Sequence, residues 1–209
     1  LGFYNAPANC VWSGGVLNAN NQTAMRCLNI DSGATNLGNL LVGVELNGGG
    51  SSSGTCVVLS GATSYDQEFI NCNIHGSGGW GIDASGSSSF GNLKVIGCTI
   101  YGNVSGGINE PTATTVGFSL SIIGCTIDAN TSGPGIKIPS TAVAGMSIIL
   151  NNNITTNGTY GIDVAAGTAA ANTAVIAYED YNNVHGNITA DYHNLTAGAH
   201  DISVDPGYV

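Results

Sequence analysis

Basic residues are almost missing from this sequence. Three of its 209 residues are Lys or Arg, against 13 Asp or Glu, so the net charge at neutral pH is −10. A surface without basic patches is unsuited to the phosphate backbone of nucleic acids and to anionic lipid headgroups. No apolar run approaches the ~18 residues that a membrane-spanning helix requires. We therefore expect no nucleic-acid partner and no membrane insertion.

The sequence also lacks the motifs of a metal or cofactor site. It contains no Cys-x-x-Cys pair and no Cys/His spacing typical of zinc ligands, so we expect neither metal nor cofactor. Charged residues make up 8% of the chain, and Asn, Ser, Thr and 32 Gly take their place. Disorder is not expected, because 43% of the residues are hydrophobic and they recur periodically.

The periodicity is a repeat of 26 or 27 residues between positions 69 and 164. Its four copies read FINCNIHGSGGWGIDA, VIGCTIYGNVSGGINE, IIGCTIDANTSGPGIKI and ILNNNITTNGTYGIDV. Two anchor positions recur, and they are occupied by Ile74, Ile100, Ile127 and Ile154, and by Ile82, Ile108, Ile136 and Ile162. Self-similarity at this period indicates a stacked repeat architecture.

Within each copy, apolar and polar residues alternate with period two, as in Ile96-Gly97-Cys98-Thr99-Ile100. This pattern predicts half-buried strands, and Gly, Asn and Ser end them. Three short strands and three turns per copy resemble a rung of the right-handed parallel β-helix, the pectin-lyase-like superfamily of secreted and surface repeat proteins. The resemblance implies an all-β solenoid of roughly seven to eight rungs for a chain of this length. It does not imply an activity, because one fold hosts many functions.

The whole chain is expected to be one domain. Residues 1–25 are interpreted as an N-terminal cap or atypical rung, 26–171 as rungs, and 172–209 as C-terminal rungs and tail. The first residue is Leu1 and not Met, which favours a processed N-terminus and an extracellular or cell-surface location.

Cysteine spacing suggests free thiols. Cys72, Cys98 and Cys125 fall at one inward position of consecutive repeats, and Asn152 continues the column. Neighbouring rungs lie ~4.8 Å apart, whereas the Cβ atoms of a disulfide prefer ~3.8 Å. We expect a buried thiol ladder, with Asn152 bonded to backbone. Whether Cys10 and Cys27 form a disulfide is left open by the sequence.

Catalytic residues are hard to assign. A relative resembling pectate lyases would need a cation-binding carboxylate cluster and a basic residue. The outward column Asp83, Asn109, Lys137 and Asp163 alternates in charge instead. A polygalacturonase-like site would need clustered Asp and an Arg-x-Lys element, which is missing. His75 and His185 lie at equivalent positions several rungs apart. We therefore expect no enzymatic site and name no catalytic residue.

Glycosylation is suggested by the triplet Asn-x-Ser/Thr. Seven Asn residues start such a triplet: Asn21, Asn103, Asn130, Asn153, Asn157, Asn187 and Asn194. Asn103, Asn130, Asn157 and Asn187 each lie three residues after a repeat anchor and should stack at one turn. We interpret this column as solvent-facing and glycosylated. The alternative is that Asn merely suits a left-handed turn.

Both termini look able to self-associate. The segments Leu1–Tyr4 and Asp201–Val209 are short, apolar and without lysine, so they leave strand edges open. The residues expected to take part in assembly are Leu1, Phe3, Tyr4, Ile202, Val204, Tyr208 and Val209. The alternative is a monomer whose tail folds back over its own last rung.

These features predict a non-enzymatic, extracellular, glycosylated structural protein. Its partner would be itself, end to end or side by side, in a head-to-tail filament or a surface layer. The alternative is a carbohydrate-active or carbohydrate-binding β-helix, including a phage-spike-like one. Ice binding is less supported, because Asn73, Thr99, Thr126 and Asn153 form too mixed an outward column.

Overall fold

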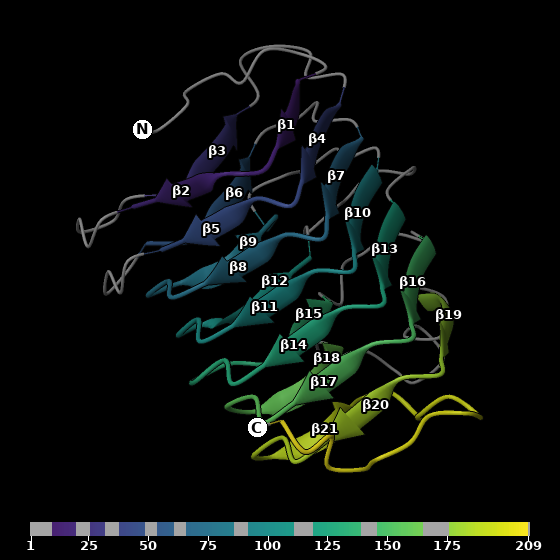
Figure 1. Ribbon diagram of the computed structural model, residues 1–209. Helices are drawn as coiled ribbons and strands as arrows, with labels where there is room; N and C mark the ends of the chain where they lie inside the picture. The colour runs from purple at the N-terminus through teal and green to yellow at the C-terminus, as the bar shows by residue number, and fades with distance from the viewer. Residues whose placement is uncertain are drawn as a thin grey trace.

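The computed structural model describes residues 10–19, 26–31, 38–48, 54–60, 66–85, 92–110, 119–138, 146–164 and 176–208. Here the chain forms β-strands and no helix, and all paired strands are parallel. A helix able to cross a membrane is accordingly not found in this part of the chain. The predicted parallel β-solenoid is confirmed (Figure 1).

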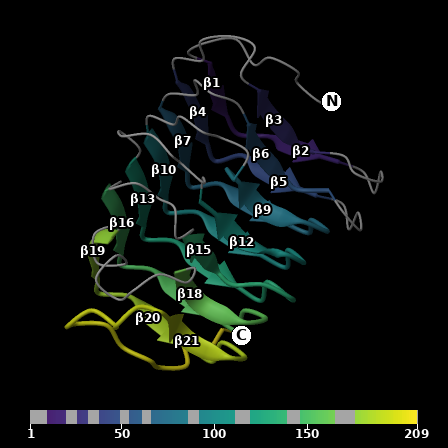
Figure 2. The ribbon, with the colours of Figure 1, turned by 180° about the vertical axis from the view of Figure 1, so that it is seen from behind.

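Three seven-stranded sheets enclose the core. Sheet A contains β1 (Val11–Ser13), β4 (Asn39–Val42), β7 (Gln67–Ile70), β10 (Asn92–Ile96), β13 (Ser119–Ile123), β16 (Met146–Leu150) and β19 (Ile176–Asp180). Sheet B contains β2 (Val16–Asn18), β5 (Glu45–Asn47), β8 (Asn73–His75), β11 (Thr99–Tyr101), β14 (Thr126–Asp128), β17 (Asn153–Thr155) and β20 (Asn183–His185). Sheet C, which faces the viewer in Figure 2, contains β3 (Leu28–Asp31), β6 (Val57–Ser60), β9 (Trp80–Asp83), β12 (Gly106–Asn109), β15 (Ile136–Ile138), β18 (Tyr160–Val164) and β21 (Ala190–His193).

The number of turns differs from the prediction. The solenoid makes about 5 turns rather than seven to eight rungs. The chain can be followed through all three sheets within 66–85, 92–110, 119–138, 146–164 and 176–208. The first two strands of each sheet are connected in part through residues 20–25 and 49–53, which lie outside the described ranges.

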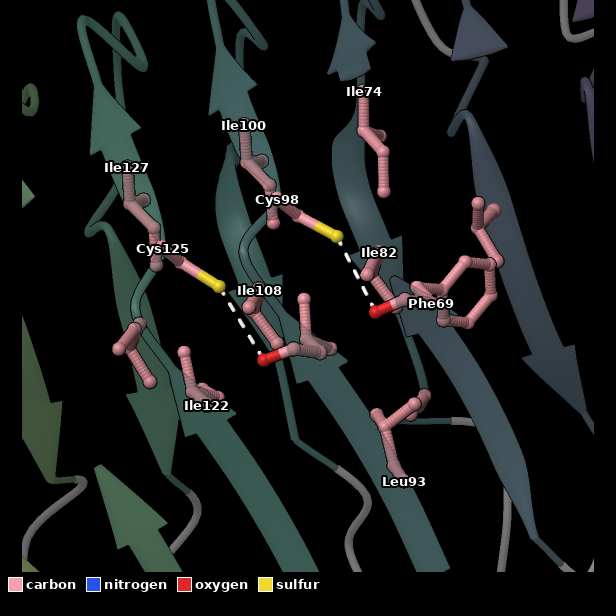
Figure 3. Packing of buried hydrophobic residues seen from close by; sticks show 14 of the residues in the cluster. Phe69, Ile74, Ile82, Leu93, Cys98, Ile100, Ile108, Ile122, Cys125 and Ile127 are labelled. Carbon is pink, nitrogen blue, oxygen red and sulfur yellow. Dashed lines mark hydrogen bonds between the residues drawn. The ribbon is translucent and has the colours of Figure 1, made fainter. Parts of the chain in front are cut away.

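The repeat anchors form inward columns, as predicted. Ile74, Ile100, Ile127 and Ile154 pair in register along sheet B, and each is 0% exposed. The second anchors, Ile82, Ile108, Ile136 and Ile162, do the same along sheet C. Aliphatic side chains from the three sheets meet in one continuous core (Figure 3). Burial of these columns is the main stabilising contribution to the fold.

From β4 onward, one left-handed residue per rung turns the chain from sheet A into sheet B. Gly97 and Gly124 have φ of 62° and 63°, and Asn71 and Asn151 have φ of 51° and 55° at the equivalent corners. Gly and Asn tolerate this region best, so their recurrence in the sequence sets the corner. Tyr181 takes the position in the last rung with φ 58°, and its ring stacks on His200 at 4.6 Å.

Candidate functional site

The four asparagines predicted to carry glycans stack at the turn between sheets B and C, but they point inward. Asn103, Asn130 and Asn157 are 0% exposed and Asn187 is 8% exposed. The predicted stacking is confirmed, and the predicted solvent-facing orientation is wrong. Such a turn must satisfy its buried backbone groups, and an inward amide offers both a donor and an acceptor for this purpose.

The amides form a continuous ladder. The Nδ2 of Asn130 donates to Oδ1 of Asn157 (2.8 Å) and to the carbonyl of Ile100 (3.4 Å). Its Oδ1 accepts from the backbone N–H (3.1 Å) and Nδ2 (3.0 Å) of Asn103. Asn103 and Asn157 repeat the pattern one rung away in either direction.

Each end of this ladder has a matching group. At the first end the backbone N–H and hydroxyl of Ser77 donate to Asn103. At the last end Asp191 accepts from the Nδ2 (2.9 Å) and the backbone N–H (3.3 Å) of Asn187. A carboxylate only accepts, so it can end a row of amides without leaving a buried donor unpaired.

The remaining acceptor triplets fall in different places. Asn21 lies outside the described residues. Asn153 is half-buried on the outer face of β17, and Asn194 is exposed just after β21. Asn194 also donates to the carbonyl of Val164 at 2.9 Å. A glycan at any of these positions stays a prediction, and the inward ladder gives it no support at the other four.

The six cysteines are free, and all except Cys10 are buried. Cys72, Cys98 and Cys125 form the expected column, and the Sγ atoms of Cys98 and Cys125 donate to the carbonyls of Phe69 and Val95 at 3.4 and 3.3 Å (Figure 3). The hydrogen bond with the thiol of Cys125 and burial raise the pKa of Cys98 to about 12, against the lowering effect of the hydrogen bond with Cys72. The thiol ladder is confirmed, and the bridge between Cys10 and Cys27 is not formed.

Asn152 continues the thiol column, as predicted, and its Nδ2 donates to the carbonyl of Ile122 at 3.0 Å. Its Nδ2 also donates to Oδ1 of Asn182 (2.9 Å), and the backbone N–H of Asn182 donates to Asp201 (2.6 Å). A second polar row therefore also ends on an aspartate. Asp201 comes from the tail, so the tail completes an internal ladder.

Asp201 and Glu179 form a close pair of carboxyl groups that we did not predict from the sequence. Burial and the neighbouring Asp201 raise the pKa of Glu179 to about 8, so it holds a proton at neutral pH. Burial alone would raise the pKa of Asp201, but hydrogen bonds from Glu179, Tyr192 and two backbone N–H groups lower it. The Tyr192 hydroxyl lies 2.6 Å from Asp201 and the Gly198 N–H lies 2.8 Å away. The contacts of Asp201 with Glu179, Tyr192 and Asn182 fasten the tail to the last rung.

The tail also extends sheet B. Ile202 forms a parallel β-bridge with Asn183. The N–H of Ile202 donates to the carbonyl of Asn182 (2.9 Å), and the carbonyl of Ile202 accepts from the N–H of Val184 (3.0 Å). Val204 exchanges two hydrogen bonds with the Asn183 side chain. The expectation that residues 201–208 leave the edge of the last rung open is therefore wrong for sheet B, and the fold-back alternative describes the tail. Ile202, Val204 and Tyr208 are nevertheless exposed, whereas Leu1, Phe3, Tyr4 and Val209 lie outside the described residues.

The outer face of sheet C carries the alternating column predicted from the sequence. Asp83, Asn109, Lys137 and Asp163 are in register, and His193 follows, 2.8 Å from Asp163. Asp83 and Asp163 are three inter-strand spacings apart, about 14 Å. Glycosidase carboxylates lie about 5–9.5 Å apart, so this pair does not form such a site.

Two aromatic side chains accompany that column. The indole of Trp80 lies against Gly106, so close that a Cβ added to this glycine would be 2.3 Å from the indole. The Nζ atom of Lys137 is 6.0 Å from the centroid of the Trp80 ring. Tyr160 stacks on His193 at 4.3 Å. We call the outer face formed by Trp80, Asp83, Asn109, Lys137, Tyr160, Asp163 and His193 the sheet C strip.

Within the described ranges, no group of three or more His, Cys, Asp or Glu side chains is arranged to hold a metal ion. No family model, no curated protein and no solved structure matches this chain.

Proposed function

We propose that the protein is a non-enzymatic, extracellular structural solenoid that assembles with copies of itself through its ends. The observation that carries the proposal is the distribution of exposed large apolar side chains. Ten are exposed in the described residues, and seven of them lie on the strands or corners of the first and last rungs or on the tail: Val11, Val16, Tyr178, Tyr181, Ile202, Val204 and Tyr208. Of the other three, Tyr101 and Val104 lie in the middle, and Ile188 lies in a turn of the last rung. Clustered exposed apolar groups mark interaction surfaces.

The strand edges support the same proposal. β1, β2 and β3 are terminal strands of their sheets at one end, as are β19 and β21 at the other. Such edges are templates for pairing with another chain. Internally, the aliphatic columns and hydrogen-bonded ladders make each rung depend on its neighbours, which suits a stiff structural unit. Glycans on Asn153 or Asn194 would be compatible with end-to-end contacts and remain part of the proposal.

End-to-end assembly predicts that Val11→Lys weakens self-association. Val11 is 67% exposed on β1, so the lysine is tolerated by the fold but places a charge in the contact. We expect the association constant to fall about tenfold or more. Light scattering and sedimentation over a concentration series measure it, and electron micrographs separate end-to-end from lateral contacts.

The matched control is Val104→Lys, because Val104 is 43% exposed in a turn in the middle of the solenoid. It should associate as the wild type does. A wild type that stays monomeric at all concentrations, or equal effects of the two lysines, contradicts the proposal.

Glycan binding by the sheet C strip is the second candidate. The half-buried indole of Trp80 beside carboxylate, amide and ammonium groups is the combination that binds rings bearing hydroxyl groups. If it operates, Trp80→Ala should abolish binding to a polysaccharide panel, and Tyr178→Ala on sheet A should not. Absence of binding by the wild-type protein eliminates this candidate.

A further inference from the structure

One outward column of sheet B is polar along its middle and apolar at its two ends. The strand registers place Val16, Glu45, Asn73, Thr99, Thr126, Asn153, Asn183 and Ile202 in this order. The middle six are polar, whereas Val16 is 58% exposed and Ile202 is 56% exposed. These two apolar ends become neighbours if the last rung of one copy lies on the first rung of the next.

We propose that residues 201–204 are a docking strand for β2 of a second copy, with Ile202 against that copy's Val16. This rests on the proposed end-to-end assembly and adds which surfaces meet and in which register. The tail follows β20 in sheet B, and β2 is the terminal strand at the opposite end. Strand addition supplies affinity through main-chain hydrogen bonds, and the side-chain columns fix the register.

The surface beside β2 is shaped to receive apolar groups. A hollow of about 360 Å³ is lined there by Trp12, Leu17 and Val44 and by Gly14 and Gly15. A Cβ added to either glycine would meet no atom of the described residues within 4 Å, so these residues leave the space beside the glycines open. The tail carries the exposed apolar side chains Val204 and Tyr208, which are of the kind that such a hollow accepts.

Charge favours a head-to-tail arrangement over a tail-to-tail one. Residues 176–208 contain neither Lys nor Arg but four Asp: Asp180, Asp191, Asp201 and Asp205. Two such ends facing each other would bring like charges together. The opposite end carries the exposed Arg26. A heterologous contact of this kind repeats without closing and gives a filament.

Cross-linking tests the register. Val16→Cys and Ile202→Cys are made separately in a Cys10→Ser background, since the other five native thiols are buried. The two variants carry tags of different mass and are treated with a short bismaleimide, alone and mixed. We expect a cross-linked dimer in the mixture, formed between positions 16 and 202, and only background in each variant alone. A dimer from Ile202→Cys alone indicates a tail-to-tail contact and overturns the inference.

Association measurements provide the second readout. Ile202→Asp should weaken self-association about tenfold or more. Ile188→Asp should change it less than about twofold, although Ile188 is 75% exposed on the same rung, because it lies in a turn outside the column. Wild-type assembly without the 16–202 cross-link, or with equal effects of the two aspartates, overturns this register and leaves the proposed function standing. Absence of wild-type assembly overturns both.

Discussion

Replacing Asn130 by Ala is expected to destabilise the solenoid by about 4 kcal/mol. The substitution removes four hydrogen bonds made by this side chain, to Asn103, Asn157 and Ile100. It leaves the buried N–H of Asn103 without its acceptor and Oδ1 of Asn157 without one donor. Such a loss is a large fraction of typical domain stability. Thermal and chemical denaturation followed by circular dichroism measure this loss of stability. We expect the melting temperature to fall by about 10 °C.

Two controls separate the ladder from the acceptor triplet. Asn153→Ala removes an outward, half-buried asparagine that accepts from Asn183 at 3.2 Å, and it should cost less than about 1 kcal/mol. Ser132→Ala destroys the triplet of Asn130 but leaves the buried amide in place, so stability should be unchanged. If Ser132→Ala is as destabilising as Asn130→Ala, the effect comes from a glycan and not from the ladder.

The orientation of Asn130 shows where sequence reasoning reached its limit. Period-two alternation places side chains within a strand, so the columns of Ile100 and Cys98 could be predicted. Asn130 lies in the turn that follows β14, where no alternation defines inside and outside. Asn suits both an exposed left-handed turn and an inward cap of backbone groups. The register between rungs was visible in the sequence, whereas the direction of the amide depends on carbonyls such as that of Ile100, supplied by the preceding rung.

The tail was difficult to predict for a different reason. Repeat alignment identifies residues that have an equivalent in the next copy, and the last rung has none. Asp201 follows Asn182 in the same ladder, but only 19 residues later and without the flanking motif. Glu179 occupies the inward position filled by Ile149 one rung earlier, a position that favours an apolar residue. A carboxyl at a core position, followed by another acid in the tail, is the signal that could have indicated the pair.

Replacing Glu110 by Gln is expected to flatten the pH dependence of stability. Glu110 is 1% exposed, and burial raises the pKa of its carboxyl to about 7. Oε1 accepts from the Ser147 hydroxyl at 2.8 Å, and Oε2 has no hydrogen-bond partner among the described residues. Because the pKa is higher in the folded state than the ordinary 4.5, the protonated carboxyl is favoured there. Its contribution is therefore full below pH 4.5, declines as the pH rises to about 7, and is constant above that.

The decline amounts to about 3 kcal/mol, since each pKa unit corresponds to about 1.4 kcal/mol. Unfolding in urea between pH 4.5 and 9 should show this loss in the wild type and a smaller one in Glu110→Gln, which cannot ionise. Glu179 continues the decline to about pH 8, so Glu110→Gln combined with Glu179→Gln should show a smaller decline than either single variant. Asp205→Asn, on an exposed tail carboxylate, should retain the wild-type slope. An equal slope in the wild type and in Glu110→Gln would mean that Glu110 is ionised in the folded core at neutral pH.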